Sequence, residues 1–309
     1  MRLSVAIPVL NEEAVLPELI RRVGAVLDGV PGGPHEMVLV DDGSTDRTRV
    51  ILAEASRRDP RVRAILLSRN FGHQPAITAA LDHVRGDLVV VMDGDLQDVP
   101  EEIPRFLAAH AEGFDVVYAR RAARKEGILL RFCYFVFYRF FASLSRLDIP
   151  LDAGDFALMT RRVVDAIRSA PERNRYLRGL RAWAGFRQCG IVVERAARAG
   201  GESKYSYGAL FRLALDGLFA FSIIPIRAAM LLGALATLGA TIFAVFAVYA
   251  KLVLDRSPQG FTSILLVVTF MSGVILFFLG VVGEYVGRVY EETKARPLYV
   301  VEEIFGDGP

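Results

Sequence analysis

Short apolar runs alternate with longer amphipathic stretches from the first residues to about Tyr118. The short runs are rich in β-branched residues, as buried strands are, and the longer stretches have the apolar spacing of helices. The expected strands are Leu3–Val9, Glu36–Asp41, Arg63–Leu67, Leu88–Asp93 and Val116–Ala119, separated by expected helices at Leu16–Leu27, Thr45–Ala55 and Gln74–Val84. This alternation predicts an α/β fold with a mostly parallel sheet and helices on both faces.

Polar side chains follow three of the expected strands at the point where each strand ends. These groups are Asn11 with Glu12, Asp41 with Asp42, and Asp93 with Asp95. Ligands of parallel α/β sheets bind beyond the carboxyl ends of the strands, so this edge is expected to bind a nucleotide. The sequence has neither a GxGxxG after its first strand nor a GxxxxGK[ST] motif, which disfavours dinucleotide enzymes and P-loop ATPases.

Two long uncharged stretches lie near the C-terminus, at Ala228–Ala250 and Ile264–Gly283. Each is long enough as a helix, at about 1.5 Å per residue, to cross a hydrocarbon core of about 30 Å. Basic residues flank the pair, and they are Arg227 on one side and Arg288, Lys294 and Arg296 on the other. The positive-inside rule therefore predicts a multi-pass protein of the plasma membrane with both termini in the cytoplasm.

The aromatic segment Ile128–Leu147 carries Arg131, Arg139 and Arg146, which share an arc of roughly 80° on a helix. One interpretation is a core helix with a solvated stripe. A basic, aromatic helix is also typical of the membrane interface, and we favour an amphipathic interface helix over residues 127–147.

The composition agrees with a membrane protein, because 53% of the residues are hydrophobic and the mean hydropathy is +0.35. A net charge of +2 is too small to indicate a nucleic-acid partner. Cys133 and Cys189 are far apart and show no zinc-ligand spacing, which favours a reducing compartment.

The segment Asp93-Gly94-Asp95-Leu96-Gln97 places two carboxylates and an amide on the turn after a buried strand. Oxygen ligands of this kind suit Mg²⁺ or Mn²⁺ bridging a diphosphate. An ordinary turn also favours Asp and Gly, and the same holds for the segment from Asp41 to Asp46. Each motif taken alone is therefore more often structural than functional.

Four segments together resemble family 2 glycosyltransferases of the GT-A fold. The segments are SVAIPVLNEE from Ser4, VDDGSTDRT from Val40, LSRNFGHQPA from Leu67 and VMDGDLQDVPEE from Val91. The resemblance is closest to the polyprenyl-phosphate branch, which includes bactoprenol glucosyltransferases and dolichol-phosphate mannose synthases. It continues through GDFALM from Gly154 and GESKY from Gly201 to the paired spans, and so covers almost the whole chain.

The resemblance implies a role for each matching residue. It assigns the nucleoside to Pro8, Asn11, Glu12 and Asp42, and it assigns the donor to Asp93, with Arg120 as a further basic donor-side residue. Asp95 and Gln97, together with Asp93, would hold the metal. Asp155 matches the proposed catalytic aspartate, although an aspartate at that place also suits a turn after Pro150. His73 is interpreted either as a cap of the next helix or as a substrate contact.

A basic segment before the spans is a candidate phosphate site. Arg195 and Arg198 precede a glycine turn with Ser203 and Lys204, and this mixture suits the phosphate of an acceptor or of the donor. A solvated loop attracted to anionic lipid is the alternative interpretation. The resemblance favours the phosphate site.

The expected organisation follows from these patterns. A cytoplasmic GT-A domain occupies residues 1–205, a juxtamembrane segment 206–226, two transmembrane helices 227–287 and a cytoplasmic tail 288–309. The Gly283 and Gly287 pair favours a homo-oligomer weakly.

The resemblance implies an inverting transferase that moves a sugar, preferably glucose from UDP-glucose, to a polyisoprenyl phosphate such as undecaprenyl phosphate. Use of GDP-mannose is an alternative. A processive polysaccharide synthase is another, but no QxxRW motif occurs.

Overall fold

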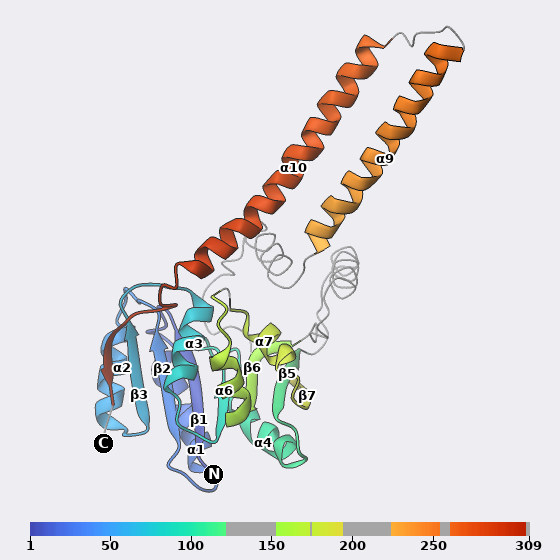
Figure 1. Cartoon of the computed structure of the whole chain (residues 1–309). Helices are drawn as coiled ribbons and strands as arrows, with labels where there is room; N and C mark the ends of the chain where they lie inside the picture. The colour runs from blue at the N-terminus through green and yellow to red at the C-terminus, as the bar shows by residue number, and fades with distance from the viewer. Residues whose placement is uncertain (122–152, 174, 194–223, 254–259, 307–309) are drawn as a thin grey trace. The chain divides into compact units, whose positions relative to one another are not determined.

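The computed structural model describes residues 1–121, 153–173, 175–193, 224–253 and 260–306. The chain divides into two compact units. The first comprises Met1–Lys204 together with Arg296–Pro309, and the second comprises Tyr205–Ala295. The described part of the first unit is a sheet covered by helices, and that of the second is a pair of long helices (Figure 1).

A mixed sheet organises the first unit, and its order within the described residues is β7-β5-β6-β4-β1-β2-β3-β8. The strands are β1 (Leu3–Val9), β2 (Glu36–Asp41), β3 (Val62–Leu67), β4 (Leu88–Val91), β5 (Val116–Arg121), β6 (Ala153–Thr160), β7 (Gln188–Val193) and β8 (Val301–Phe305). Strands β4, β1, β2 and β3 are parallel, as the sequence predicted. β6 runs antiparallel to β4 and β5, and β8 runs antiparallel to β3, so the sheet is mixed.

Helices cover both faces of this sheet because the residues of its central strands β1, β2, β3 and β4 are buried on both sides. The helices of the first unit are α1 (Leu16–Asp28), α2 (Thr48–Arg58), α3 (His73–His83), α4 (Ile103–Ala111), α6 (Arg161–Ser169) and α7 (Leu177–Trp183), with a short turn η1 (Pro100–Glu102). α1, α2 and α4 pack on the face that contains Val5 and Ile7, whereas α3, α6 and α7 pack on the face that contains Ala6. Neighbouring residues of one strand thus enter different cores, as the alternation of a strand requires.

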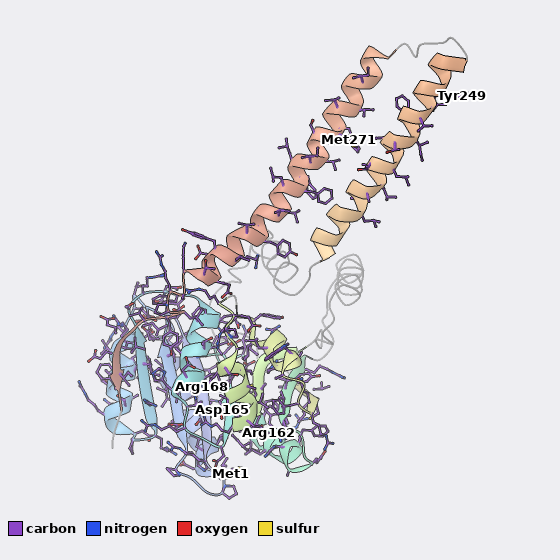
Figure 2. All side chains as sticks on the ribbon, in the orientation of Figure 1. Met1, Arg162, Asp165, Arg168, Tyr249 and Met271 are labelled. Carbon is purple, nitrogen blue, oxygen red and sulfur yellow. The ribbon has the colours of Figure 1, made fainter. Side chains whose placement is uncertain are left out.

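α6 shows how a helix of this layer meets the sheet. Val163, Val164 and Ile167 are buried against it. Arg162, Asp165 and Arg168 occupy the outer side of the helix (Figure 2), and their side chains are 66%, 55% and 39% exposed. Apolar and charged positions therefore alternate with the helical period. This amphipathic pattern is enough to determine which side of α6 packs against the sheet.

The C-terminal residues belong partly to the sheet, which corrects the expectation of a tail over 288–309. α10 continues to Thr293, and Val301–Phe305 forms the edge strand β8 beside β3. The backbone of Ser68 donates to Val300, and the Tyr299 hydroxyl donates to Asp82 on α3 at 2.8 Å. This pairing was not predictable from the sequence, because a five-residue strand with two glutamates resembles a polar tail.

The second unit contains α9 (Ile224–Val253) and α10 (Phe261–Thr293). Their described apolar side chains lie largely exposed, for example Phe243 at 63% and Phe277 at 67%. Within the described residues one segment, Phe270–Thr293, is long and apolar enough to cross a membrane, and a shorter apolar stretch is Leu231–Phe243. Both expected spans are thus helical, but the structure does not confirm two transmembrane helices, and the span expected at Ala228–Ala250 stays a prediction.

Some expectations fall outside the described residues. These are the interface helix over 127–147, most of the juxtamembrane segment 206–226, and the basic residues Arg195, Arg198, Ser203 and Lys204.

Gly43 provides a test of the local fold at the end of β2. Its φ is +75°, and a Cβ there would lie 2.5 Å from the backbone of Arg69 and Asn70. Gly43→Ala should therefore lower the free energy of unfolding by roughly 1–3 kcal/mol. Gly29→Ala is the matched control, because its Cβ would meet only Val26 O at an ordinary 3.5 Å. Denaturation of the detergent-solubilised chain measures both variants, and equal stability of the two would contradict the close approach.

Candidate active site

The carboxyl ends of β1, β2 and β4 meet the beginning of β6 at one edge of the sheet. β4 and β6 pair antiparallel, with Val91 opposite Ala157. Continued by two residues, this register sets Asp93 opposite Asp155. Residues 62 positions apart in the sequence are therefore brought together by strand pairing, and not by the motif that contains either of them.

The loop after β1 is held by the loop after β2. Asn11 has a φ of +54°, and its side-chain oxygen accepts the Thr45 N–H at 2.8 Å. Its own N–H donates to Ser44 Oγ at 2.8 Å, and the Glu12 N–H donates to Thr48 Oγ1 at 2.9 Å. Asn tolerates the left-handed backbone better than most residues, which explains its place at this turn. Asn11 and Glu12, both predicted nucleoside residues, thus lie on one cross-linked pair of loops.

Asp42 holds the segment that leads into α3. Its carboxylate is buried and accepts the N–H groups of Phe71 at 2.7 Å and Gly72 at 2.9 Å. Burial raises the pKa of Asp42, although these two hydrogen bonds oppose the shift. The predicted nucleoside residue therefore also fixes where α3 begins, with Gly72 as its N-cap and His73 as its first residue.

The turn after β4 presents Asp93, Asp95 and Gln97 as partly exposed side chains. The Asp93 N–H donates to Asp98 Oδ2 at 3.0 Å, and the Gln97 N–H donates to Asp95 Oδ1 at 3.1 Å. Leu96 between them has a φ of +60°, which is unusual for a non-glycine residue. Asp98 belongs to the segment that begins at Val91, but no role was predicted for it. The structure shows that its carboxylate supports the turn.

This turn has the chemistry of a shared cation site. Within the described ranges, no group of three or more His, Cys, Asp or Glu side chains gathers closely enough to hold a metal by itself. Mg²⁺ commonly takes one or two carboxylates and completes its shell with water and substrate phosphates. The carboxylates of Asp93 and Asp95 and the amide of Gln97 fit that kind of ligand set.

Asp155 lies within strand β6 and not on the turn that the sequence also allowed. It is 8% exposed, and Arg178 of α7 grips it bidentately, with Nε 2.9 Å from Oδ1 and Nη2 3.0 Å from Oδ2. Burial acts to raise the pKa of Asp155, but His73 and Arg178 outweigh it and hold that pKa well below its ordinary value. Asp155 is therefore a permanently ionised carboxylate.

His73 lies between the two opposed aspartates. Its Nε2 is 3.5 Å from Asp93 Oδ1 and 3.8 Å from Asp155 Oδ2. Burial lowers the pKa of His73, but the two carboxylates more than offset this and raise it. Burial, followed by the negative charge of Asp98, raises the pKa of Asp93 to about 6. Neighbouring carboxylates thus differ sharply in proton affinity, as is common at active sites.

Arg181 supports β6 from the same helix as Arg178. It is 2% exposed, and its Nη2 donates to Gly154 O at 2.8 Å. Its guanidinium lies 5.9 Å from the centre of the Tyr118 ring on β5. No role was predicted from the sequence for Arg178 or Arg181. Their spacing of three residues, which places both on one face of a helix, was the available signal.

The remaining predicted residues have simpler surroundings. Pro8 is a buried residue of β1 that pairs with Val40. Arg120 is an exposed residue of β5, the strand that neighbours β6. Arg195, Arg198, Ser203 and Lys204 lie outside the described residues, so their relation to Asp155 stays a prediction.

The ion pair between Arg178 and Asp155 predicts a stability effect. Arg178→Ala should lower the free energy of unfolding by about 2–4 kcal/mol, because it leaves a buried carboxylate without its partner. Arg21→Ala is the control, since Arg21 pairs with Glu18 on an exposed, solvent-screened surface and its loss should leave the stability nearly unchanged. Denaturation can be followed through Trp183, the single tryptophan, on the same helix as Arg178. A loss as small as that of the control would contradict a buried, paired carboxylate.

Comparisons with known proteins identify relatives of the whole chain. The model of glycosyl transferase family 2 matches residues 4–168. The uncharacterized glycosyltransferase YkcC of Bacillus subtilis (strain 168) is 41% identical over 98% of this chain and 94% of its own. The bactoprenol glucosyl transferase of Shigella phage SfX is 36% identical over 98% of this chain and 99% of its own.

A solved structure shows a more distant likeness. It is glucosyl-3-phosphoglycerate synthase from Mycobacterium tuberculosis in complex with Mn²⁺, UDP-glucose and phosphoglyceric acid. It is 20% identical, with a TM-score of 0.49 over 71% of this chain and 79% of that one, a likeness too distant to carry its ligands over. The family match spans more than half of the chain and the two curated relatives span nearly all of it, so the chain belongs to glycosyl transferase family 2.

Proposed function

We propose that the chain transfers a hexose to a polyisoprenyl phosphate at the cytoplasmic face of the plasma membrane, and that its preferred donor is UDP-glucose. The observation that carries this proposal is the opposition of Asp93 and Asp155 across β4 and β6, directly beside the loops after β1 and β2. A donor held at those loops would direct its sugar towards Asp155. The name of the phage SfX relative, a bactoprenol glucosyl transferase, supports the lipid acceptor.

The donor's diphosphate is assigned to the turn after β4. Asp93, Asp95 and Gln97 would hold Mg²⁺ or Mn²⁺, which would neutralise the charge of the leaving nucleotide diphosphate. Pro8, Asn11, Glu12 and Asp42 are assigned to the nucleoside. Arg120 would lie further along the edge, on β5.

The acceptor is assigned to the basic segment that includes Arg195, Arg198, Ser203 and Lys204. A phosphate monoester has a second pKa of about 6, so much of it is a dianion at neutral pH. An acceptor in that form needs little help from a base, which fits an Asp155 that is ionised and held by Arg178. Its oxygen would form the new bond to the anomeric carbon while the bond to the nucleotide diphosphate breaks, with inversion. Asp155 would orient the reactants and stabilise positive charge at that carbon.

The order of the two units supports membrane insertion as a hairpin. Tyr205–Ala295 interrupts the first unit, whose sheet includes β7 before the interruption and β8 after it. A folded sheet lies on one side of a membrane, so an inserted segment between two of its strands must cross an even number of times. In this proposal α9 and α10 would supply two crossings, and the positive-inside rule would give the cytoplasm as the side of the sheet.

Transfer by the purified chain tests the proposal. Detergent-solubilised protein with Mg²⁺ or Mn²⁺ and undecaprenyl phosphate should form a glycolipid from UDP-glucose in preference to the other nucleotide sugars of a panel. EDTA or Asp95→Asn should abolish the product, because the charge that binds the cation is lost. Asp165→Asn on the exposed side of α6 is the control and should keep full activity.

Three outcomes would revise the proposal separately. Exclusive use of GDP-mannose would replace the donor and leave the mechanism in place. A growing polysaccharide would indicate a processive synthase. Undiminished activity in EDTA or in Asp95→Asn would remove the cation from the mechanism.

A further inference from the structure

His73 has an incompletely used hydrogen-bond donor at the centre of the site. Its Nε2 lies 3.5 Å from Asp93 Oδ1 and 3.8 Å from Asp155 Oδ2. Both separations exceed the 2.7–3.2 Å of a good N–H···O hydrogen bond. The side chain is 48% exposed although both neighbours are less so. The imidazole edge is therefore accessible to a ligand atom placed between the two carboxylates.

The strand order shows which part of a donor would reach this edge. Across the sheet the order is β2, β1, β4 and β6. The proposed nucleoside residues follow β1 and β2, and Asp155 lies on β6. β4 lies between β1 and β6, so the group that leaves the nucleotide for the acceptor would lie past the carboxyl end of β4. The transferred sugar is that group. Its hydroxyls need both donors and acceptors, and the two aspartates supply only acceptors when ionised.

The backbone holds His73 in this position from two sides. Asp42 binds the N–H groups of Phe71 and Gly72 immediately before it. Immediately after it, Gln74 Oε1 accepts the N–H of Leu177 at 2.9 Å, which ties the beginning of α3 to the beginning of α7. Arg178, the partner of Asp155, is the next residue of α7. The imidazole and the catalytic carboxylate are thus positioned by one connected set of contacts.

We propose that His73 is a specificity-determining residue that donates a hydrogen bond from Nε2 to one hydroxyl of the sugar of the nucleotide sugar. The inference rests on the proposed function and names the sugar contact within the same site. It requires an N–H at Nε2, which both the Nε2-protonated neutral ring and the doubly protonated ring provide.

Donor binding to the full-length chain in detergent tests this role. Titration calorimetry with the divalent cation would compare UDP, UDP-glucose and its 2-, 3-, 4- and 6-deoxyglucose analogues. His73→Ala should weaken UDP-glucose roughly tenfold and change the affinity for UDP less than about twofold. One deoxy analogue should bind the wild-type chain as weakly as UDP-glucose binds His73→Ala, and for that analogue His73→Ala should add no further loss.

Two variants sharpen the result. His73→Gln keeps an N–H donor on a side chain of similar reach and should recover part of the lost affinity. His83→Ala changes a histidine at the other end of the same helix, where Nδ1 faces Ala79 O, and should leave every ligand unaffected.

The contrary results are distinct. An equal loss for UDP and UDP-glucose, or an equal loss for every deoxy analogue, would show that His73 only supports the carboxylates and would overturn the inference. Absence of sugar transfer to undecaprenyl phosphate by a wild-type chain that still shows the hydroxyl-dependent pattern would contradict the proposed function alone. A wild-type chain that bound none of the nucleotide ligands would contradict both.

Discussion

The antiparallel pairing of β6 with β4 is the constraint on which the candidate site depends. It places Asp155 level with Asp93, and it inserts β6 between the parallel strands β4 and β1 to β3 on one side and β5 with β7 on the other. β6 also packs against α4 through the ring contact of Phe106 and Phe156, whose centroids are 4.7 Å apart. A shift of this register by one residue would turn Asp155 to the opposite face of the sheet. The geometry of the candidate site is thus a consequence of core packing.

Charge balance around Asp155 then determines its chemistry. A buried carboxylate without a charged partner would tend to be protonated, since burial favours the uncharged form. Arg178 binds both of its oxygens, and Arg181 adds a second buried guanidinium whose pKa burial lowers to about 10 and which remains charged at neutral pH. Burial, followed by the negative charge of Asp98, raises the pKa of Asp93 to about 6. Ionisation of Asp155 is therefore built into the fold and does not depend on substrate.

The sequence predicted the parts of the site that are local in the chain. The strands at Leu3–Val9 and Glu36–Asp41 have the predicted bounds, and the turn from Asp93 to Gln97 follows its strand as expected. Direction and partners of the later strands were not predictable from apolar runs, because alternation does not encode whether a strand runs parallel to its neighbour. The role of Arg178 was not predictable from the sequence for a similar reason. Its importance comes from a contact with a residue 23 positions earlier, whereas its own helix is short and basic.

Asp155→Asn tests most directly whether the charge opposite Asp93 takes part in the reaction. UDP-glucose binding and sugar transfer would be measured in the same preparation. Asn has nearly the same shape and can still accept a hydrogen bond from Arg178, but it lacks the negative charge. We expect UDP-glucose to bind within about threefold of the wild-type affinity while kcat for transfer to undecaprenyl phosphate falls by roughly a thousandfold. Transfer within about tenfold of the wild-type rate would show that the charge opposite Asp93 is not part of the reaction centre.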